Sequence, residues 1–118
     1  WWDAAVRYQS EDVFGSTEGY IKVFKDRFGV TPDYGHASYT VAAVVLQLAI
    51  EQAGTVDREK VRDALANLNA KTFFGPIKFD EIGQANSYSP PIFQIQNGKT
   101  VVLYPESTKQ GDLRLGVK

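Results

Sequence analysis

The sequence of 118 residues contains no cysteine, no methionine and a single histidine, His36. Without cysteine the chain can form no disulfide, thiolate zinc site or iron–sulfur cluster, and it has no cysteine nucleophile. The absence of cysteine is compatible with both reducing and oxidising compartments. Because histidine is the residue type that ordinarily titrates near neutral pH, His36 is the main candidate for acid–base chemistry.

The chain also lacks a charge excess and a long apolar run. It has 13 Lys and Arg against 14 Asp and Glu, a formal net charge of −1, whereas proteins that bind a phosphate backbone need a basic surplus. The longest apolar run, residues 41–50, is interrupted by Gln47 and is shorter than the roughly 20 residues that span a bilayer. We therefore predict no nucleic-acid partner and no direct membrane insertion.

Motifs that signal catalysis, metals or cofactors are missing as well. Ser38 lies two residues after His36, but no Gly-x-Ser-x-Gly surrounds it. Asp80, Glu81 and Asn86 lack the alternating ligands and closing Glu of a calcium loop, and no glycine-rich phosphate motif occurs. We predict no catalytic residue, no metal site and no cofactor.

Capping residues and apolar spacing predict three helices after an irregular, aromatic-rich first segment of fifteen residues. The first helix is capped by Ser16 and stopped by Gly29, and the second runs from about residue 37 to 53. A third begins after Asp57, and its apolar stripe consists of Val61, Ala64, Leu65 and Leu68. The second helix is apolar on almost every side over residues 41–50, which predicts that most of its surface is buried.

Period-two patterning replaces the helical pattern after Asn69. The segment 73–79 leads into a strand over 77–79, and two apolar runs, 92–96 and 100–104, flank Asn97 and Gly98. Asn-Gly suits the two positive-φ positions of a type I′ turn, so these runs are predicted to form a hairpin. The polar end of the chain, residues 106–118, is predicted to be a tail that is mobile or depends on a partner for its structure.

The order of these segments resembles the extracellular solute receptors of the branched-chain amino acid ABC transporter family, which are type I periplasmic binding proteins. The similarity covers about residues 20–105. It rests on the runs FGVTPDY at 28–34, AIEQAG at 49–54, DREKVRDAL at 57–65, TFFGPIKFD at 72–80 and FQI at 93–95. Each run is weak alone, but their order and combination are specific.

The resemblance implies a two-lobed α/β fold that closes on a small ligand as a hinge, of which this chain would be the C-terminal part. Residues 1–105 would form a lobe segment of three helices ending in a crossover hairpin. The start at Trp1-Trp2, with no methionine, fits such a fragment. Most of the parallel sheet would then belong to residues outside the chain. Either those residues cover the apolar helix, or the fragment self-associates through it.

The resemblance also implies a site and a role. The connection Tyr34-Gly35-His36 would form the wall near the ligand side chain, with Trp2 at the mouth of the cleft, while the main anchoring residues would lie outside this chain. Many relatives have an apolar or aromatic residue at the position of His36, so an amino acid or an aromatic carboxylate is the expected ligand.

The expected role is a non-enzymatic, periplasmic receptor that is made with a signal peptide and delivers its ligand to an ABC permease. Two alternatives stay open: a regulatory, ligand-sensing domain of the same fold, and a small α/β enzyme that uses His36.

Overall fold

The computed structural model describes residues 2–85 and 90–116, which form three helices followed by two antiparallel hairpins. The helices are α1 (Thr17–Phe28), α2 (Tyr34–Ala53) and α3 (Arg58–Ala66). The strands are β1 (Asn69–Thr72), β2 (Gly75–Lys78), β3 (Ile92–Gln96) and β4 (Lys99–Tyr104), and a 3₁₀ turn, η1 (Glu106–Thr108), follows them.

The first helix begins and ends where its capping residues predict, and the third begins where its capping residue predicts but ends at Ala66, before Leu68 of its predicted stripe. Ser16 accepts a hydrogen bond from the backbone N–H of Gly19 at 3.0 Å, and Gly29, with φ 74°, ends α1. Asp57 caps α3 by accepting from the backbone N–H of Lys60 at 3.1 Å. The prediction of the first helix and of the start of the third is confirmed.

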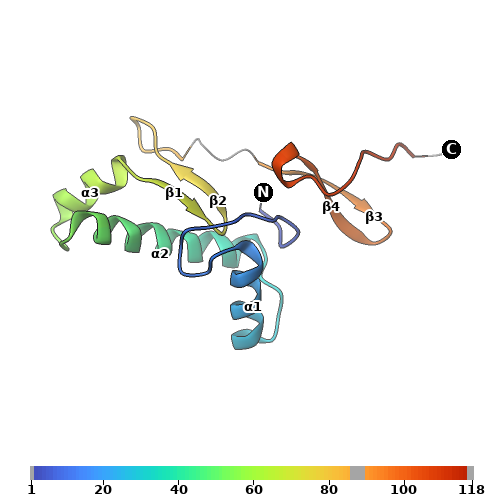
Figure 1. The fold of residues 1–118 in the computed structure, drawn as a ribbon, viewed down its shortest axis with the longest axis horizontal. Coiled ribbons are helices and arrows are strands. Elements are labelled where there is room, and N and C mark those ends of the chain that lie inside the picture. Colours follow the sequence, from blue (N-terminus) through green and yellow to red (C-terminus); the bar gives the residue numbers. More distant parts are fainter. Residues whose placement is uncertain (1, 86–89, 117–118) are drawn as a thin grey trace.

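The long helix α2 is the axis of the fold (Figure 1). In that view α3 lies at its C-terminal end, α1 stands across its N-terminal end, and β1 and β2 lie above it. The inner face of α2 shares one core with both hairpins and the N-terminal segment. The buried members of this core include Trp2, Val6, Tyr20, Val41, Val44, Val45, Ile77 and Val102.

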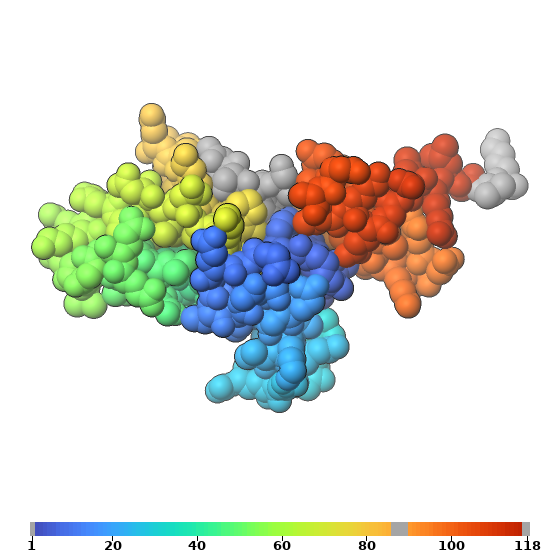
Figure 2. Space-filling view, in the orientation of Figure 1, coloured from blue at the N-terminus to red at the C-terminus, as the bar shows by residue number. Residues whose placement is uncertain are grey.

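Two details tie distant segments to this core. The hydroxyl of Thr17, a fully buried residue, donates to the carbonyl of Phe73 at 2.8 Å and accepts from the backbone N–H of Tyr8 at 3.0 Å. Val102 of β4 is also fully buried, which brings the second hairpin against the N-terminal segment. Figure 2 shows the end of α1 and the connection after it projecting from the body that results.

The Asn-Gly hairpin prediction is confirmed. Asn97 and Gly98 have φ values of 53° and 75°, and Phe93 pairs with Val102 and Ile95 with Thr100. A bulge between Ile92 and Phe93 shifts the register at the open end of the hairpin. The segment predicted as a tail includes η1, and beyond it Arg114 exchanges hydrogen bonds with the side chain of Gln94.

Two expectations need correction or stay open, and one strand was not expected. The second helix begins at Tyr34 rather than near residue 37, because Asp33 caps it. Strand β1 was not predicted, and it forms because the turn at Phe73 and Phe74 folds residues 69–72 back onto β2. On α2, the outer residues Ala42, Ala43 and Leu46 are exposed, so the predicted cover of this face stays a prediction.

Trp1, Asn86 and residues 117–118 lie outside the described residues. Among the residues that are described, no single helix is long and apolar enough to cross a membrane, and α2 and α3 pass such a test only as a pair bent by 109°.

Candidate functional site

The N-terminus of α2 is held by a reciprocal cap between Asp33 and His36. The carboxylate of Asp33 accepts from the backbone N–H of His36 at 3.0 Å, while the backbone N–H of Asp33 donates to Nδ1 of His36 at 3.3 Å. This is a capping box with histidine in the place usually taken by Glu or Gln. The cap fixes the backbone of Tyr34 and Gly35, which lie between its two members.

The same contacts keep Asp33 charged. The hydrogen bond from the backbone N–H of His36 is the largest cause that holds the pKa of the Asp33 carboxyl below its ordinary value. A negative charge at this place also interacts favourably with the N-terminal end of the helix dipole. The cap is therefore strongest when Asp33 is ionised.

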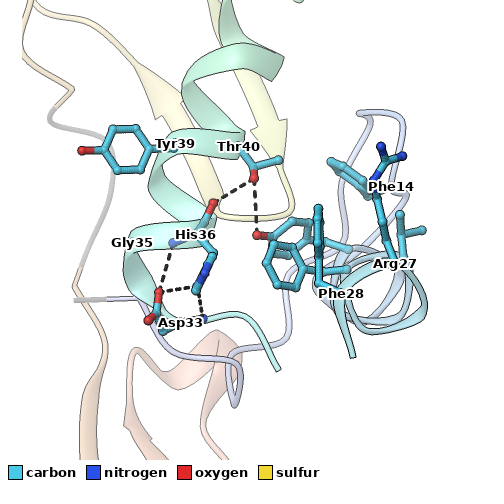
Figure 3. Close-up of a pocket in the computed structure, with 11 residues that line it drawn as sticks. Phe14, Arg27, Phe28, Asp33, Gly35, His36, Tyr39 and Thr40 are labelled. Atoms are coloured by element: carbon cyan, nitrogen blue, oxygen red, sulfur yellow. Dashed lines mark hydrogen bonds and ion pairs between the residues drawn. The ribbon is translucent and has the colours of Figure 1, made fainter. Parts of the chain in front are cut away.

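His36 faces α1 rather than Tyr34. Its Nδ1 lies 2.7 Å from the Asp33 carboxylate, and its half-exposed ring meets Phe24 edge to face at 4.9 Å between centroids. Figure 3 shows it beside Asp33, with the hydroxyl of Thr40 bonded to its backbone carbonyl. His36 thereby links the start of α2 to the aromatic face of α1.

A groove of about 660 Å³ separates α1 from the first turns of α2 (Figure 3). Its lining residues are Phe14, Tyr20, Val23, Phe24, Arg27, Phe28, Asp33, Gly35, His36, Tyr39 and Thr40. The Arg27 guanidinium lies 5.7 Å from the centre of the Phe28 ring, and the Tyr20 hydroxyl is 3.4 Å from that of Thr40. Burial raises the pKa of Tyr20, so this hydroxyl stays neutral. A mostly apolar groove with a few polar groups is typical of small-molecule sites.

Tyr34 lies outside the groove. Its ring centre is 6.3 Å from that of Phe74 in the turn between β1 and β2, and the residue is 41 % exposed. Since residues two apart on a helix point in nearly opposite directions, Tyr34 and His36 mark two sides of the same helix start. The structure thus brings them into one turn but not onto one surface.

Gly35 lines the groove beside His36. A Cβ atom added there would lie 3.3 Å from the Asp33 carboxylate oxygen, which is tighter than an ordinary contact. Glycine at this place therefore leaves room for the Asp33 carboxylate that caps α2. It also leaves the backbone uncovered by a side chain between Tyr34 and His36.

Trp2 is a core residue in the structure. It is fully buried, its ring stacks on Phe74 at 6.1 Å and 10°, and it meets Tyr20 and Phe73 edge to face. Its indole Nε1 has no hydrogen-bond partner among the described residues. The predicted place of Trp2 at a cleft mouth stays a prediction. Trp2 is connected to the candidate wall only indirectly, because its ring contacts Phe74 and Phe74 contacts Tyr34.

Two residues of this site were missed in the sequence. Asp33 could have been found, because an Asp three residues before a side chain that can accept a hydrogen bond is a capping pattern. Phe74 could not, because its contact with Tyr34 joins residues 40 positions apart. Among residues 2–85 and 90–116 no three His, Asp or Glu side chains form a group that could hold a metal ion.

Comparison with known proteins places the chain in the periplasmic binding protein family. A family model described as periplasmic binding protein matches residues 4–100. Leu/Ile/Val-binding protein homolog 7 of Brucella suis biovar 1 is 32 % identical over 104 residues, which are 83 % of this chain and 26 % of that protein. Its counterpart in Brucella melitensis biotype 1 is 31 % identical over the same shares of both chains.

A solved structure agrees. The leucine-binding protein LivK of Thermotoga maritima superposes with a TM-score of 0.57 and 31 % identity, over 73 % of this chain and 25 % of that one. The chain therefore spans about a quarter of the length of the relatives it matches.

Proposed function

Since the chain belongs to the periplasmic binding protein family, in its branched-chain amino acid type, we propose that it is part of a receptor for an amino acid or a related small carboxylate, aromatic carboxylates included. The receptor binds its ligand outside the cytoplasm and presents it to an ABC permease. It catalyses no reaction and needs no cofactor. The observation that carries this proposal is the family match, which extends over residues 4–100.

The proposed ligand wall is the start of α2, formed by Tyr34, Gly35 and His36. The capping box between Asp33 and His36 supports this choice, because it holds the backbone of the wall before any ligand arrives. A preorganised wall lowers the entropic cost of binding. Tyr34, at 41 % exposure, has ring surface available to a ligand side chain.

The two sides of the helix start would have different tasks. Tyr34 offers a flat ring with a hydroxyl, a type of surface that accepts apolar and aromatic side chains. His36 offers a polar ring that is tied to Asp33 and that reaches the groove beside α1. This combination supports ligands that are larger or more polar than a purely aliphatic amino acid.

The proposed mechanism is closure of two lobes on the ligand about a hinge. Residues 1–105 would contribute to one lobe and end in a crossover, the β3–β4 hairpin, with residues 106–118 following as a tail. The contact of Val102 with the core supports a hairpin that leaves the lobe from a fixed base.

A binding screen tests the function. The natural protein is titrated calorimetrically with the branched-chain amino acids, phenylalanine, tyrosine, histidine and simple aromatic carboxylates. We expect binding in at least one of the two classes, without turnover of the ligand. A properly folded protein that binds no compound from either class would contradict the proposal.

A further inference from the structure

A row of three aromatic rings connects the core to the proposed ligand wall. Trp2, fully buried, stacks on Phe74 with 6.1 Å between ring centres and 10° between ring planes. Phe74, 8 % exposed, in turn lies 6.3 Å from Tyr34 at an angle of 53°. The innermost ring is part of the core and the outermost ring is 41 % exposed.

We propose that Phe74 is a positioning residue for ligand binding, which sets the orientation of the Tyr34 ring from the turn between β1 and β2. The inference rests on the proposed function, because it assumes that Tyr34 contacts the ligand. It adds a residue from a different part of the chain, one that needs no ligand contact of its own.

The backbone and the ring of Tyr34 are held by different parts of the fold. Asp33 and His36 fix the backbone through the capping box, but a cap places no constraint on the side-chain torsions of the residue next to it. The ring of Phe74 restricts those torsions, since it occupies one side of the space that the Tyr34 ring can sweep.

Phe74 can perform this task because its own turn is rigid. The hydroxyl of Thr72, which is fully buried, accepts from the backbone N–H of Phe74 at 3.3 Å and donates to the carbonyl of Gly75 at 2.7 Å. The neighbouring N–H of Phe73 donates to the Asp12 carboxylate at 2.8 Å. A binding site keeps its productive geometry when each residue that contacts the ligand is packed against a second residue that is itself held rigidly. Tyr34 would be the contact residue and Phe74 the residue behind it.

Phe73 provides a matched control in the same turn. It is also a phenylalanine and also meets the Trp2 ring, at 6.5 Å, but its closest stacking partner is Tyr20, at 4.0 Å, on α1. Phe73 is fully buried, whereas Phe74 is 8 % exposed. Its replacement is therefore expected to lower stability at least as much, while the ring next to Tyr34 is retained.

The experiment uses the natural protein and the tightest ligand found in the binding screen. Phe74→Leu keeps apolar volume but removes the ring, and we expect it to weaken ligand affinity by about 3- to 10-fold, the worth of one aromatic pair. Phe74→Tyr keeps the ring and is expected to restore affinity to within about twofold. Phe73→Leu is expected to lower the Tm at least as much as Phe74→Leu, with affinity within about twofold of the wild type.

A second readout follows the Tyr34 ring itself. With fluorotyrosine incorporated and the Tyr34 resonance assigned by Tyr34→Phe, we expect Phe74→Leu to shift that resonance in the ligand-free protein and Phe73→Leu to leave it nearly unchanged. An unshifted resonance in Phe74→Leu, or an affinity that follows Tm across all variants, overturns the positioning role.

The outcomes separate the two proposals. If Tyr34→Ala weakens binding and Phe74→Leu does not, the positioning inference fails and the proposed wall stands. If both variants bind the ligand as tightly as the wild-type protein does, Tyr34 is not part of the wall, and both the proposed wall and its positioning residue are wrong. A wild-type protein that binds nothing in the screen refutes the proposed function and this inference with it.

Discussion

Thr17 holds the N-terminal segment, α1 and the turn at Phe73 together, and its replacement by valine is predicted to destabilise the fold strongly. Valine has nearly the shape of threonine, so Thr17→Val leaves no cavity. It removes the hydroxyl that donates to the Phe73 carbonyl at 2.8 Å and accepts from the Tyr8 N–H at 3.0 Å. A polar group left unsatisfied on burial costs about 1–3 kcal/mol. With two such groups, we expect the free energy of unfolding to fall by about 2–4 kcal/mol.

Thr17→Ser is the informative control for this prediction. Serine keeps the hydroxyl and loses one buried methyl group, which costs about 1 kcal/mol. Urea denaturation followed by circular dichroism measures the free energy of unfolding for the three proteins. The expected order of stability is wild type, then serine, then valine. A valine variant as stable as the wild type, or more stable than the serine variant, would show that packing and not hydrogen bonding governs this position.

Two further predictions concern the helix cap and the Asn-Gly turn. Because the Asp33 pKa is lowered in the folded state, the contribution of Asp33 to stability is present above the ordinary carboxyl pKa of about 3.9 and is lost as the pH falls through the lowered pKa. Asp33→Asn, which still caps the helix, is expected to flatten the acidic part of the curve of stability against pH. An unchanged acidic part would refute the role of the Asp33 charge in the cap. Gly98→Ala places a Cβ at φ 75° and is expected to lower the free energy of unfolding by about 1–2 kcal/mol. The control Gly116→Ala, where the added Cβ meets open space, is expected to change it by less than about 0.5 kcal/mol. Equal stability of the two variants in thermal denaturation would contradict the turn at Asn97 and Gly98.

Local rules predict much of this fold because its helix ends and one of its turns are encoded by neighbouring residues. Ser16, Gly29, Asp57 and the Asn97–Gly98 pair each act within a few residues of their own position, and each does in the structure what its type favours. Asp33 follows the same rule, so its capping pattern predicts that α2 begins at Tyr34.

The features that could not be predicted depend on contacts between distant segments. Three of the four residues of strand β1, Asn69, Ala70 and Lys71, have little intrinsic preference for a strand. The strand pairs with β2 because Asp12 and Thr17 hold the turn at Phe73 from the far end of the chain. The same turn buries Trp2 and places Phe74 beside Tyr34, so the surroundings of two candidate site residues were decided by packing.

The residues of the candidate site stay a prediction, and their arrangement was not predicted. The sequence, through the family resemblance, pointed to Tyr34-Gly35-His36, and these residues do form one turn. That the two side chains point to different surfaces follows from the helix beginning at Tyr34, since helical geometry separates side chains two residues apart.

Isothermal titration of the natural protein with leucine and with the tightest ligand of the screen, repeated for Tyr34→Ala and Val56→Ala, tests the central claim most directly. Val56 follows the opposite end of α2 and is 80 % exposed. If the start of α2 is the ligand wall, loss of the Tyr34 ring weakens affinity about tenfold or more, while truncation of Val56 changes it less than about twofold. Equal affinities for all three proteins would contradict the claim.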